Sequence, residues 1–208
     1  MLGVWDYTVI LTYLSALLSL SGMGLALSGK FGLSMLFLAL SGICDLFDGQ
    51  VARSKRNRTA DEKKFGIQID SLCDLVSFGV FPAVAGFSLN PTLSPEKLVF
   101  VLFPLCGLIR LAFYNVQEEN RQKETEEKRK YFTGVPITSS AVLFPFLYLF
   151  SNVIPGDAYY IIYVIFSGIL MCLFVLKLRF PKPAKPLLFA LITGGIFLLI
   201  RGVLFVVL

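Results

Sequence analysis

The sequence predicts an all-α integral membrane protein, a bundle of about seven transmembrane helices that form a single domain over residues 1–208. Three observations carry this prediction. The composition is 56% hydrophobic with a mean hydropathy of +0.75, which is more apolar surface than a soluble domain of 208 residues needs. Apolar runs of about 20 residues, the length of a membrane span, recur along the chain. The breaks between these runs alternate between strongly basic and nearly uncharged.

Seven apolar runs are long enough to cross about 30 Å of hydrocarbon at about 1.5 Å per residue. They lie near residues 7–28, 32–53, 66–89, 95–117, 134–152, 157–178 and 185–208. Gly194, Gly195 and Arg201 interrupt the last run, so part of it is predicted to be a bent or interfacial helix. No cleavable signal peptide is expected, because only Asp6 precedes the first run where a basic segment would stand.

Basic residues gather in the second, fourth and sixth connections, whereas the other three connections hold only Lys30 and Lys97. The basic set comprises Arg53, Lys55, Arg56, Arg58, Lys63 and Lys64, then Arg121, Lys123, Lys128, Arg129 and Lys130, then Lys177, Arg179, Lys182 and Lys185. The positive-inside rule therefore predicts a cytoplasmic N-terminus and cytoplasmic basic loops. The plasma membrane is the expected location. These loops favour anionic membrane lipids. The chain carries no nucleic-acid module, and no nucleic-acid partner is expected.

Four aspartates stand in two pairs near predicted cytoplasmic helix ends: Asp45 and Asp48, then Asp70 and Asp74. Spacings of three and four place each pair on one helix face. Ionisable residues inside a membrane indicate function, and carboxylates this close repel each other unless a cation or proton intervenes. Hard divalent cations bind such oxygen ligands together with substrate phosphates. The chain lacks histidine, and its four cysteines lie singly in apolar runs, which argues against zinc or redox chemistry.

Small residues stand one turn from the aspartates and share their helix faces. They are Gly49, Ala52 and Gly66. A small side chain lets a ligand approach the backbone, although small residues also serve close helix packing in membranes. Arg53, one turn beyond Gly49, is placed either to hold a phosphate or to extend toward the membrane interface.

The pattern Asp45-x-x-Asp48-Gly49-x-x-Ala52-Arg53, followed by Gly66-x-x-x-Asp70-x-x-x-Asp74, resembles the signature of the CDP-alcohol phosphatidyltransferases. The resemblance implies two divalent cations, Mg²⁺ or Mn²⁺, held by Asp45, Asp48, Asp70 and Asp74, with the first three as main ligands. It also implies that Asp74 is the catalytic base. Residues implied at the CDP-lipid site are Gly49, Ala52, Arg53 and Gly66, with Thr12 and Ser15 near the cytidine. Twelve residues separate Arg53 from Gly66, where the common pattern has eight, so a longer cytoplasmic elbow is expected.

Further stretches resemble the phosphatidylserine synthase branch of that family: "DSLCDLVSFGVFP", "LIRLAFYNV", "YFTGVPIT" and "LRFPKPAKP". This resemblance implies CDP-diacylglycerol and L-serine as substrates and a homodimer as the assembly. Arg110, predicted to end the fourth helix, is the candidate partner of the serine carboxylate, and an interface role is the alternative. Ser77, Gly134 and Pro136 are the other candidates at the acceptor site. Phe113 stands where relatives often have a second arginine, and Thr138 replaces a frequent proline.

Two other functions fit part of this pattern. The same chemistry with inositol phosphate or glycerol phosphate would need several cations at the acceptor site, and only Arg110 is placed for that. An ion-coupled transporter also uses intramembrane carboxylates. However, all four aspartates lie at one predicted depth, and no charged residue lies midway through the later helices.

Overall fold

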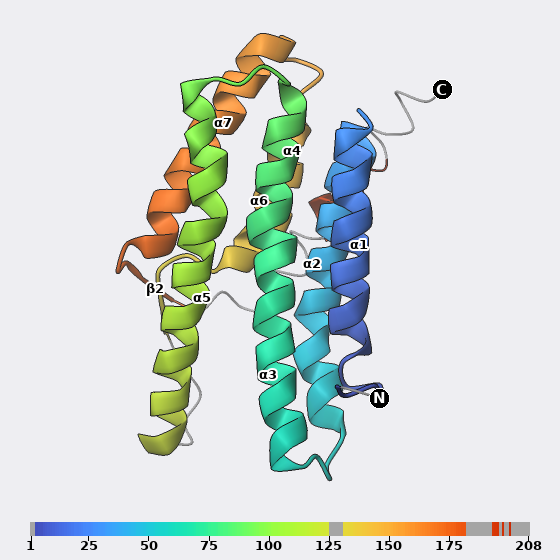
Figure 1. The fold of residues 1–208 in the computed structure, drawn as a ribbon, viewed down its shortest axis with the longest axis vertical. Coiled ribbons are helices and arrows are strands. Elements are labelled where there is room, and N and C mark those ends of the chain that lie inside the picture. The colour runs from blue at the N-terminus through green and yellow to red at the C-terminus, as the bar shows by residue number, and fades with distance from the viewer. Residues whose placement is uncertain (1–2, 125–130, 182–192, 196, 198–199, 201–208) are drawn as a thin grey trace.

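The computed structural model describes residues 3–124, 131–181, 193–195, 197 and 200, and these form an upright helical bundle (Figure 1). The helices are α1 (Ile10–Leu27), α2 (Phe31–Ser54), α3 (Ala60–Asp74), α4 (Phe81–Leu89), α5 (Leu98–Glu124), α6 (Ser140–Tyr148) and α7 (Gly156–Val175). A π-helical segment, Leu75–Val80, joins α3 to α4, and single 3-10 turns at Pro95–Lys97 and Ile137–Ser139 precede α5 and α6. Two three-residue strands, β1 (Tyr131–Thr133) and β2 (Arg179–Pro181), pair antiparallel. The all-α class is confirmed.

Five helices within the described residues are long and apolar enough to cross a membrane, which makes the chain an integral membrane protein. They are Ile10–Leu27, Phe31–Ser54, Ala60–Leu89, Pro95–Arg121 and Gly156–Val175. The predicted span 134–152 is wrong in length, because the helical part there is only Ile137–Tyr148. Gly134 adopts a left-handed φ of 77°, and Pro136 has an extended ψ of 143°, so the helix cannot begin before Ile137. The predicted span 185–208 lies almost wholly outside the described residues.

The third span begins six residues earlier than predicted, at Ala60 instead of residue 66. Thr59 accepts a hydrogen bond from the Glu62 backbone, and the Glu62 side chain accepts one from the Thr59 backbone. This capping box satisfies two N–H groups at the helix start. The elbow between α2 and α3 is therefore only five residues long, 55–59, and the two helices run antiparallel side by side (Figure 1).

Small residues let the helices in the upper part of the bundle approach one another closely. A Cβ added at Gly22 of α1 would lie 2.3 Å from a ring carbon of Phe81. A Cβ added at Gly42 of α2 would lie 2.4 Å from the Cβ of Ala141 in α6. Such small-residue contacts are typical of packing between membrane helices.

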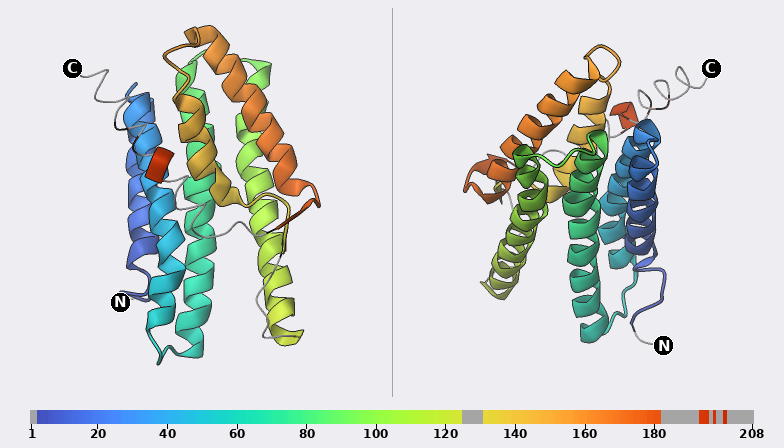
Figure 2. Two further views of the ribbon diagram at one scale, coloured as in Figure 1. Left: turned by 180° about the vertical axis from the view of Figure 1, so that it is seen from behind. Right: turned by 45° about the horizontal axis from the view of Figure 1, so that its top comes forward.

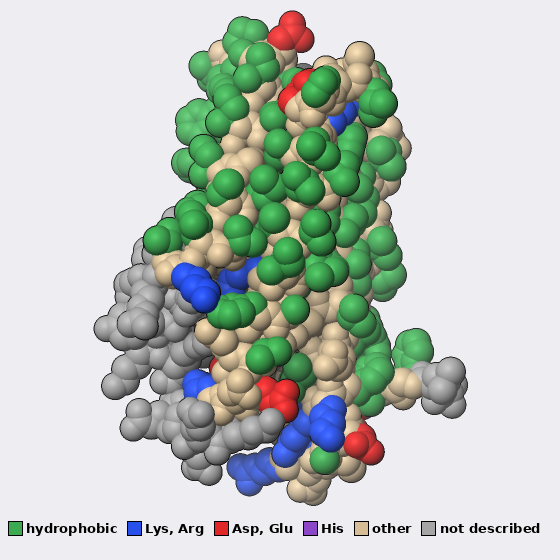
Figure 3. Space-filling model, turned by 60° about the vertical axis from the view of Figure 1, so that its left-hand side comes forward, with side chains coloured by type: hydrophobic (Ala, Val, Ile, Leu, Met, Phe, Trp, Pro, Cys, Tyr) green, Lys and Arg blue, Asp and Glu red, His purple; other side chains and the backbone are tan. Residues whose placement is uncertain are grey.

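Aromatic rings fill the interior on the side of α5, α6 and α7. Helix α6 packs against α2, and its Phe144 contacts Tyr163 of α7 with ring centroids 4.9 Å apart. Figure 2 shows the ribbon of α7 running obliquely beside α6. Phe103 and Phe174 lie 5.3 Å apart, and the buried Tyr163 hydroxyl donates to the Pro82 carbonyl at 2.8 Å. The outward faces of α1, α5 and α7 carry exposed leucine, isoleucine and valine. Figure 3 shows this apolar surface over the upper bundle and basic side chains toward the lower end.

The N-terminal segment is fastened to the α2–α3 elbow at one end of the bundle. The Lys55 Nζ contacts Asp6 Oδ2 at 2.6 Å and Glu62 Oε1 at 3.0 Å. Figure 1 shows the N-terminus at the same end as this elbow. The N-terminal segment and the elbow therefore lie at the same end of the bundle.

Candidate functional site

The antiparallel pairing of α2 and α3 brings all four predicted aspartates together near the elbow. Carboxylate oxygens of Asp45, Asp70 and Asp74 lie within 4.8 Å of one another. Asp48 interacts with Asp70, and Asp45 interacts with Asp74. The close pairs thus form between the two helices, with one member from each, as well as along each helix face.

This cluster has the chemistry of a divalent-cation site. Three partly buried carboxylates supply oxygen ligands of the kind that Mg²⁺ and other hard cations prefer. Their mutual repulsion in a poorly hydrated place requires a compensating positive charge or proton. Asp48, 8% exposed, adds a fourth carboxylate beside Asp70. The residues present therefore fit a bound cation.

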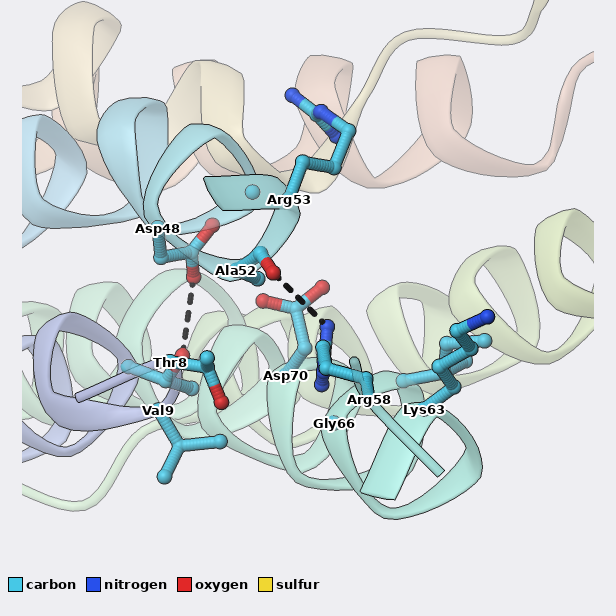
Figure 4. Close-up of a pocket in the computed structure, with 12 residues that line it drawn as sticks. Thr8, Val9, Asp48, Ala52, Arg53, Arg58, Lys63, Gly66 and Asp70 are labelled. Atoms are coloured by element: carbon cyan, nitrogen blue, oxygen red, sulfur yellow. Dashed lines mark hydrogen bonds between the residues drawn. The ribbon is translucent and has the colours of Figure 1, made fainter. Parts of the chain in front are cut away.

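A cavity of about 220 Å³ opens beside the Asp48 and Asp70 end of this cluster (Figure 4). The predicted residues that line it are Thr12, Asp48, Gly49, Ala52, Arg53, Gly66 and Asp70. Its lining thus combines the carboxylates of Asp48 and Asp70 with the guanidinium groups of Arg53 and Arg58. Such a cavity suits a ligand that presents both a metal-bound anion and further negative charge.

Arginine side chains lie over the glycines of this cavity. A Cβ added at Gly49 would lie 3.2 Å from Arg53 Nη1, and one added at Gly66 would lie 2.5 Å from Arg58 Nη2. Both neighbours are the ends of flexible side chains, which a ligand can displace. The glycines leave bare backbone facing the cavity, as the sequence predicted.

The two first-helix candidates have different roles in the structure. Thr12 lines the cavity, and its hydroxyl donates to Asp48 Oδ2 at 3.2 Å, which orients that carboxylate. The Ser15 hydroxyl donates to the Ser41 carbonyl at 3.1 Å between α1 and α2. Ser15 is buried and does not line this cavity, so its visible role is helix packing.

Sequence reasoning missed five further cavity residues, Thr8, Val9, Arg58, Lys63 and Ile67. Arg58 donates to the Glu62 carbonyl at 3.0 Å and to the Ala52 carbonyl at 3.4 Å, so its guanidinium bridges the start of α3 and the end of α2. Lys63 and Gly66 share a helix face with Asp70. The Thr59-x-x-Glu62 capping box was the signal that could have found Lys63, because it starts α3 early enough to place this residue on that face.

The prediction that Arg110 ends its helix is wrong. Arg110 lies inside α5, because the helix continues to Glu124. It is 5% exposed, and its guanidinium donates to the carbonyls of Val135 at 3.1 Å and Gly134 at 3.4 Å. Asn115, further along α5, donates to the Ser71 hydroxyl at 2.8 Å. This contact ties α5 to α3 one residue from Asp70. Arg110 does not line the cavity described above.

The depth of Arg110 follows from the contacts between α5 and the third span, which run antiparallel. Ser71 meets Asn115, and a Cβ at Gly107 would lie 3.9 Å from the Gly79 Cα. Position 110 falls between these two contacts, close to the level of residue 76. Arg110 is therefore about one helical turn or less from the level of Asp74 along the bundle axis.

The remaining acceptor candidates lie around Arg110 and the π-helical segment. Gly134 has a left-handed φ of 77°, and an added Cβ would lie 3.2 Å from the carbonyl oxygens of Phe174 and Leu176, so the position requires glycine. Pro136 caps the 3-10 turn that follows it. Ser77 is fully buried in the π-helical segment, and its hydroxyl has no hydrogen-bond partner among the described residues. Single π-helical turns are frequent at functional sites.

Charges outside the membrane-spanning helices stabilise the cavity's N-terminal wall. The Lys55 ammonium, hydrogen-bonded to Asp6, lowers the pKa of that carboxyl to about 2, helped by Thr8. The same hydrogen bonds, to Asp6 first and then to Glu62, raise the pKa of Lys55. Thr8 donates to Asp6 through both its backbone and its hydroxyl. The ion pair therefore holds Thr8 and Val9 beside the cavity.

Comparisons with known proteins agree with this geometry. The family model of CDP-alcohol phosphatidyltransferase matches residues 7–178. A CDP-diacylglycerol–serine O-phosphatidyltransferase of Saccharomyces cerevisiae is 38% identical over 143 residues, 66% of this chain and 50% of that protein. A protein of the same name from Methanocaldococcus jannaschii is 29% identical over 198 residues, 95% of this chain and 83% of that protein.

An archaetidylserine synthase of Methanothermobacter thermautotrophicus is 35% identical over 138 residues, 66% of this chain and 52% of that protein. The chain thus spans about half the length of the yeast and Methanothermobacter relatives and most of the Methanocaldococcus one. The family match covers most of the chain and includes the aspartates that α2 and α3 bring together. The chain therefore belongs to the CDP-alcohol phosphatidyltransferase family.

Proposed function

We propose that this protein transfers the phosphatidyl group of CDP-diacylglycerol to the hydroxyl of L-serine, giving phosphatidylserine and CMP. The observation that supports this most strongly is that four aspartates meet beside a cavity that Arg53, Arg58 and Lys63 also line. Such a site suits a diphosphate substrate. The names of the relatives support serine as the acceptor.

The donor site is proposed to hold two divalent cations, Mg²⁺ or Mn²⁺, on Asp45, Asp48, Asp70 and Asp74. When bound, such cations neutralise charge that develops at phosphorus and on the leaving phosphate. Arg53, Arg58 and Lys63, which line the same cavity, bind the remaining phosphate charge. Gly49, Ala52 and Gly66 let the diphosphate approach the backbone, while Thr12 keeps the Asp48 carboxylate in position.

The acceptor step is proposed to use Asp74 and Arg110. Asp74 takes the proton of the serine hydroxyl, whose oxygen forms a new bond to the lipid-side phosphorus as the bond to CMP breaks. A guanidinium carries five N–H donors, so Arg110 can bind the serine carboxylate while holding the Gly134 and Val135 carbonyls. Ser77, Gly134 and Pro136 support this side of the site.

The proposed setting is the plasma membrane, with the elbow and N-terminus in the cytoplasm and two copies forming a homodimer. The positive-inside rule supports this orientation. A single cysteine at Asn57 of the elbow, in a variant without the native cysteines, tests it. It should resist a membrane-impermeant thiol reagent in intact cells and react after lysis, whereas reaction in intact cells would reverse the orientation.

The acceptor is tested with the purified full chain, CDP-diacylglycerol, Mn²⁺ or Mg²⁺, and separate alcohols. Serine, glycerol phosphate, inositol phosphate and ethanolamine are compared by CMP release, and mass spectrometry identifies the lipid product. An ether-linked CDP-lipid is included because one relative is an archaetidylserine synthase. Phosphatidylserine formed with serine supports the proposal. CMP release only with a phosphorylated alcohol would reassign the acceptor, and none with any alcohol would reject the proposed reaction.

A further inference from the structure

A second, larger cavity lies at the end of the bundle opposite the elbow. Its volume is about 710 Å³. It forms where α2 and α7 begin, beside the connection from α4 to α5 and the turn that follows α6. These parts meet at the top of Figure 1. Asp45, the aspartate of α2 nearest to this end, lies 14 residues from Phe31, about 20 Å along the helix. The proposed reaction uses none of the residues that line the cavity.

Aromatic rings make one wall of this cavity. Phe31, Tyr148 and Tyr159 all line it, and the Phe31 ring lies 5.8 Å from the Tyr148 ring and 6.3 Å from the Tyr159 ring, measured between centroids. The Phe31 and Tyr159 rings meet edge to face. Aromatic faces carry partial negative charge and attract cations.

Carboxylates also line the cavity. Glu96 lines the cavity and is held by hydrogen bonds from the Tyr160 hydroxyl at 3.2 Å and from the Ser94 hydroxyl. Asp157 also lines it, from the first turn of α7, where the helix dipole stabilises a negative charge. Acidic side chains are visible at this end in Figure 3. The cavity therefore combines fixed negative charge with aromatic faces.

The buried ammonium group of Lys97 lies near the cavity but contacts other groups. Lys97 is 4% exposed, donates to the Asn90 carbonyl, and lies 5.4 Å from the Phe87 ring centroid. It is not among the residues that line the cavity. Lys30, the residue before Phe31, does not line the cavity either. Glu96 and Asp157 are thus the only charged groups among the described lining residues, so the cavity favours a cationic ligand.

The buried hydroxyl of Tyr159, a residue that lines the cavity, lacks a hydrogen-bond partner among the described residues. Tyr159 is only 4% exposed. A buried hydroxyl without a partner is costly, and such groups usually meet water or a ligand. A ligand that carries N–H donors would satisfy both the phenol oxygen and the carboxylates.

From these walls we infer that the cavity binds a primary ammonium group, either of a free amine or of a phospholipid headgroup such as ethanolamine. Its N–H groups donate to Glu96, Asp157 and the Tyr159 hydroxyl, and its charge faces the rings of Phe31 and Tyr148. A quaternary ammonium keeps the ring contacts but loses the hydrogen bonds. An amine that carries its own carboxylate is repelled by the acidic wall.

Calorimetric titration of ethanolamine into the full chain, purified in detergent without amine lipids, tests this site. Glu96→Gln should weaken binding about tenfold or more, because it removes a charged hydrogen bond. Tyr159→Phe should weaken it several-fold, and choline should bind the unsubstituted chain more weakly than ethanolamine. Tyr13→Phe is the matched control, since the Tyr13 hydroxyl donates to the Val4 carbonyl near the opposite end. Thermal unfolding confirms that each variant is folded.

The source of the ammonium group is separated by a lipid experiment. Chains reconstituted with phosphatidylethanolamine and phosphatidylglycerol are compared by native mass spectrometry for retained lipid. Retention of phosphatidylethanolamine that Glu96→Gln removes identifies a headgroup site, and saturable binding of free ethanolamine that Glu96→Gln weakens identifies a free-amine site. Ethanolamine that enters the serine site would bind equally to the chain with and without Glu96→Gln. Binding unaffected by both variants, or no binding in either experiment, would overturn the inference.

Discussion

Two glycines of the same helix, α2, show how differently the two halves of this bundle use a missing side chain. The Cβ that Gly42 lacks would lie 2.4 Å from the Ala141 Cβ, whereas the one that Gly49 lacks would lie 3.2 Å from the Arg53 guanidinium. Gly42 therefore allows two helices to touch. Gly49 instead leaves backbone open under a side chain that can move away.

The two halves also differ in the charged residues of their interiors. The described upper half is held by small-residue contacts and aromatic rings, while the elbow half carries four aspartates and the basic cavity wall. Charged groups in a membrane protein are costly and are retained where they act. Close packing in the upper half holds α2 and the third span in place, so the elbow half can keep its four mutually repelling aspartates close together. Substitutions in the two halves should therefore affect different measurements.

The largest expected effect comes from the aspartates. Asp74→Asn should lower kcat by about 10²–10⁴-fold, since it removes a general base, while CDP-lipid binding largely survives. Asp48→Asn should lose both binding and turnover, because Asp48 is proposed to hold the donor site. Asp61→Asn, an exposed position in the first turn of α3, is the matched control and should leave turnover unchanged. CMP release and CDP-lipid binding measure the two properties. A near-normal kcat in Asp74→Asn would place the base elsewhere.

Arg110→Ala should raise KM for serine about tenfold to a hundredfold, with a much smaller change in KM for CDP-diacylglycerol. A hydrogen bond to a charged group contributes about 1.5–3 kcal/mol, which corresponds to this range. Arg110→Lys should recover only part of the loss, because an ammonium cannot reproduce the guanidinium fork. Ethanolamine, which lacks the carboxylate, should be a poor acceptor for the unsubstituted enzyme. The Arg110→Ala variant should discriminate less between serine and ethanolamine. Equal loss toward both substrates would assign Arg110 to the donor site or to holding the Gly134 loop.

The glycine comparison itself is tested by alanine. Gly42→Ala should lower the free energy of unfolding by about 1–3 kcal/mol, because the new methyl group overpacks the α2–α6 contact. Gly66→Ala should change stability little, because its neighbour is the movable end of Arg58. It should instead raise KM for the CDP-lipid. Thermal unfolding and kinetics on both variants give the answer. Similar stability losses in the two variants would refute the division between packed and open halves.

The smallest effect concerns the Asp6–Lys55 ion pair at the elbow. The pKa of Asp6 is lowered to about 2 from 3.8, so its contribution to stability is present above pH 3.8 and is lost as the pH falls toward 2. Asp6→Asn should therefore lower the Tm slightly at neutral pH. The difference from the unsubstituted chain should vanish in strong acid. A difference that is constant with pH would show that the carboxylate charge is not the cause.

Much of the fold could be predicted because its signals are local. Apolar run length placed α1, α2 and the spans of α5 and α7 to within a few residues, apart from the extension of α5 to Glu124. The short α6 was not foreseen, since hydropathy does not register the left-handed backbone at Gly134. The spacing of Asp45, Asp48, Asp70 and Asp74 predicted their helix faces. It could not show that Asp45 meets Asp74, because that contact depends on the length of the elbow.

The site was predicted best where a residue's role depends on its own helix and worst where it depends on a neighbour. Gly49, Ala52 and Gly66 line the cavity as their spacing suggested. The sequence indicates Arg58 only as one of the basic residues that set the orientation, because its bridge from Ala52 to Glu62 exists only after α3 has folded beside α2. Ser15 was expected near the ligand but does not line the cavity. Its hydroxyl instead donates to the Ser41 carbonyl of α2.

The central claim is that the elbow half of the bundle is a divalent-cation centre for phosphatidyl transfer. The direct measurement is CMP release by the purified full chain from CDP-diacylglycerol and serine, before and after EDTA, with Mn²⁺ or Mg²⁺ then restored in excess. The clustered carboxylates of Asp45, Asp70 and Asp74 predict that EDTA abolishes CMP release and that the added cation restores it. Full CMP release in metal-free buffer would contradict the claim.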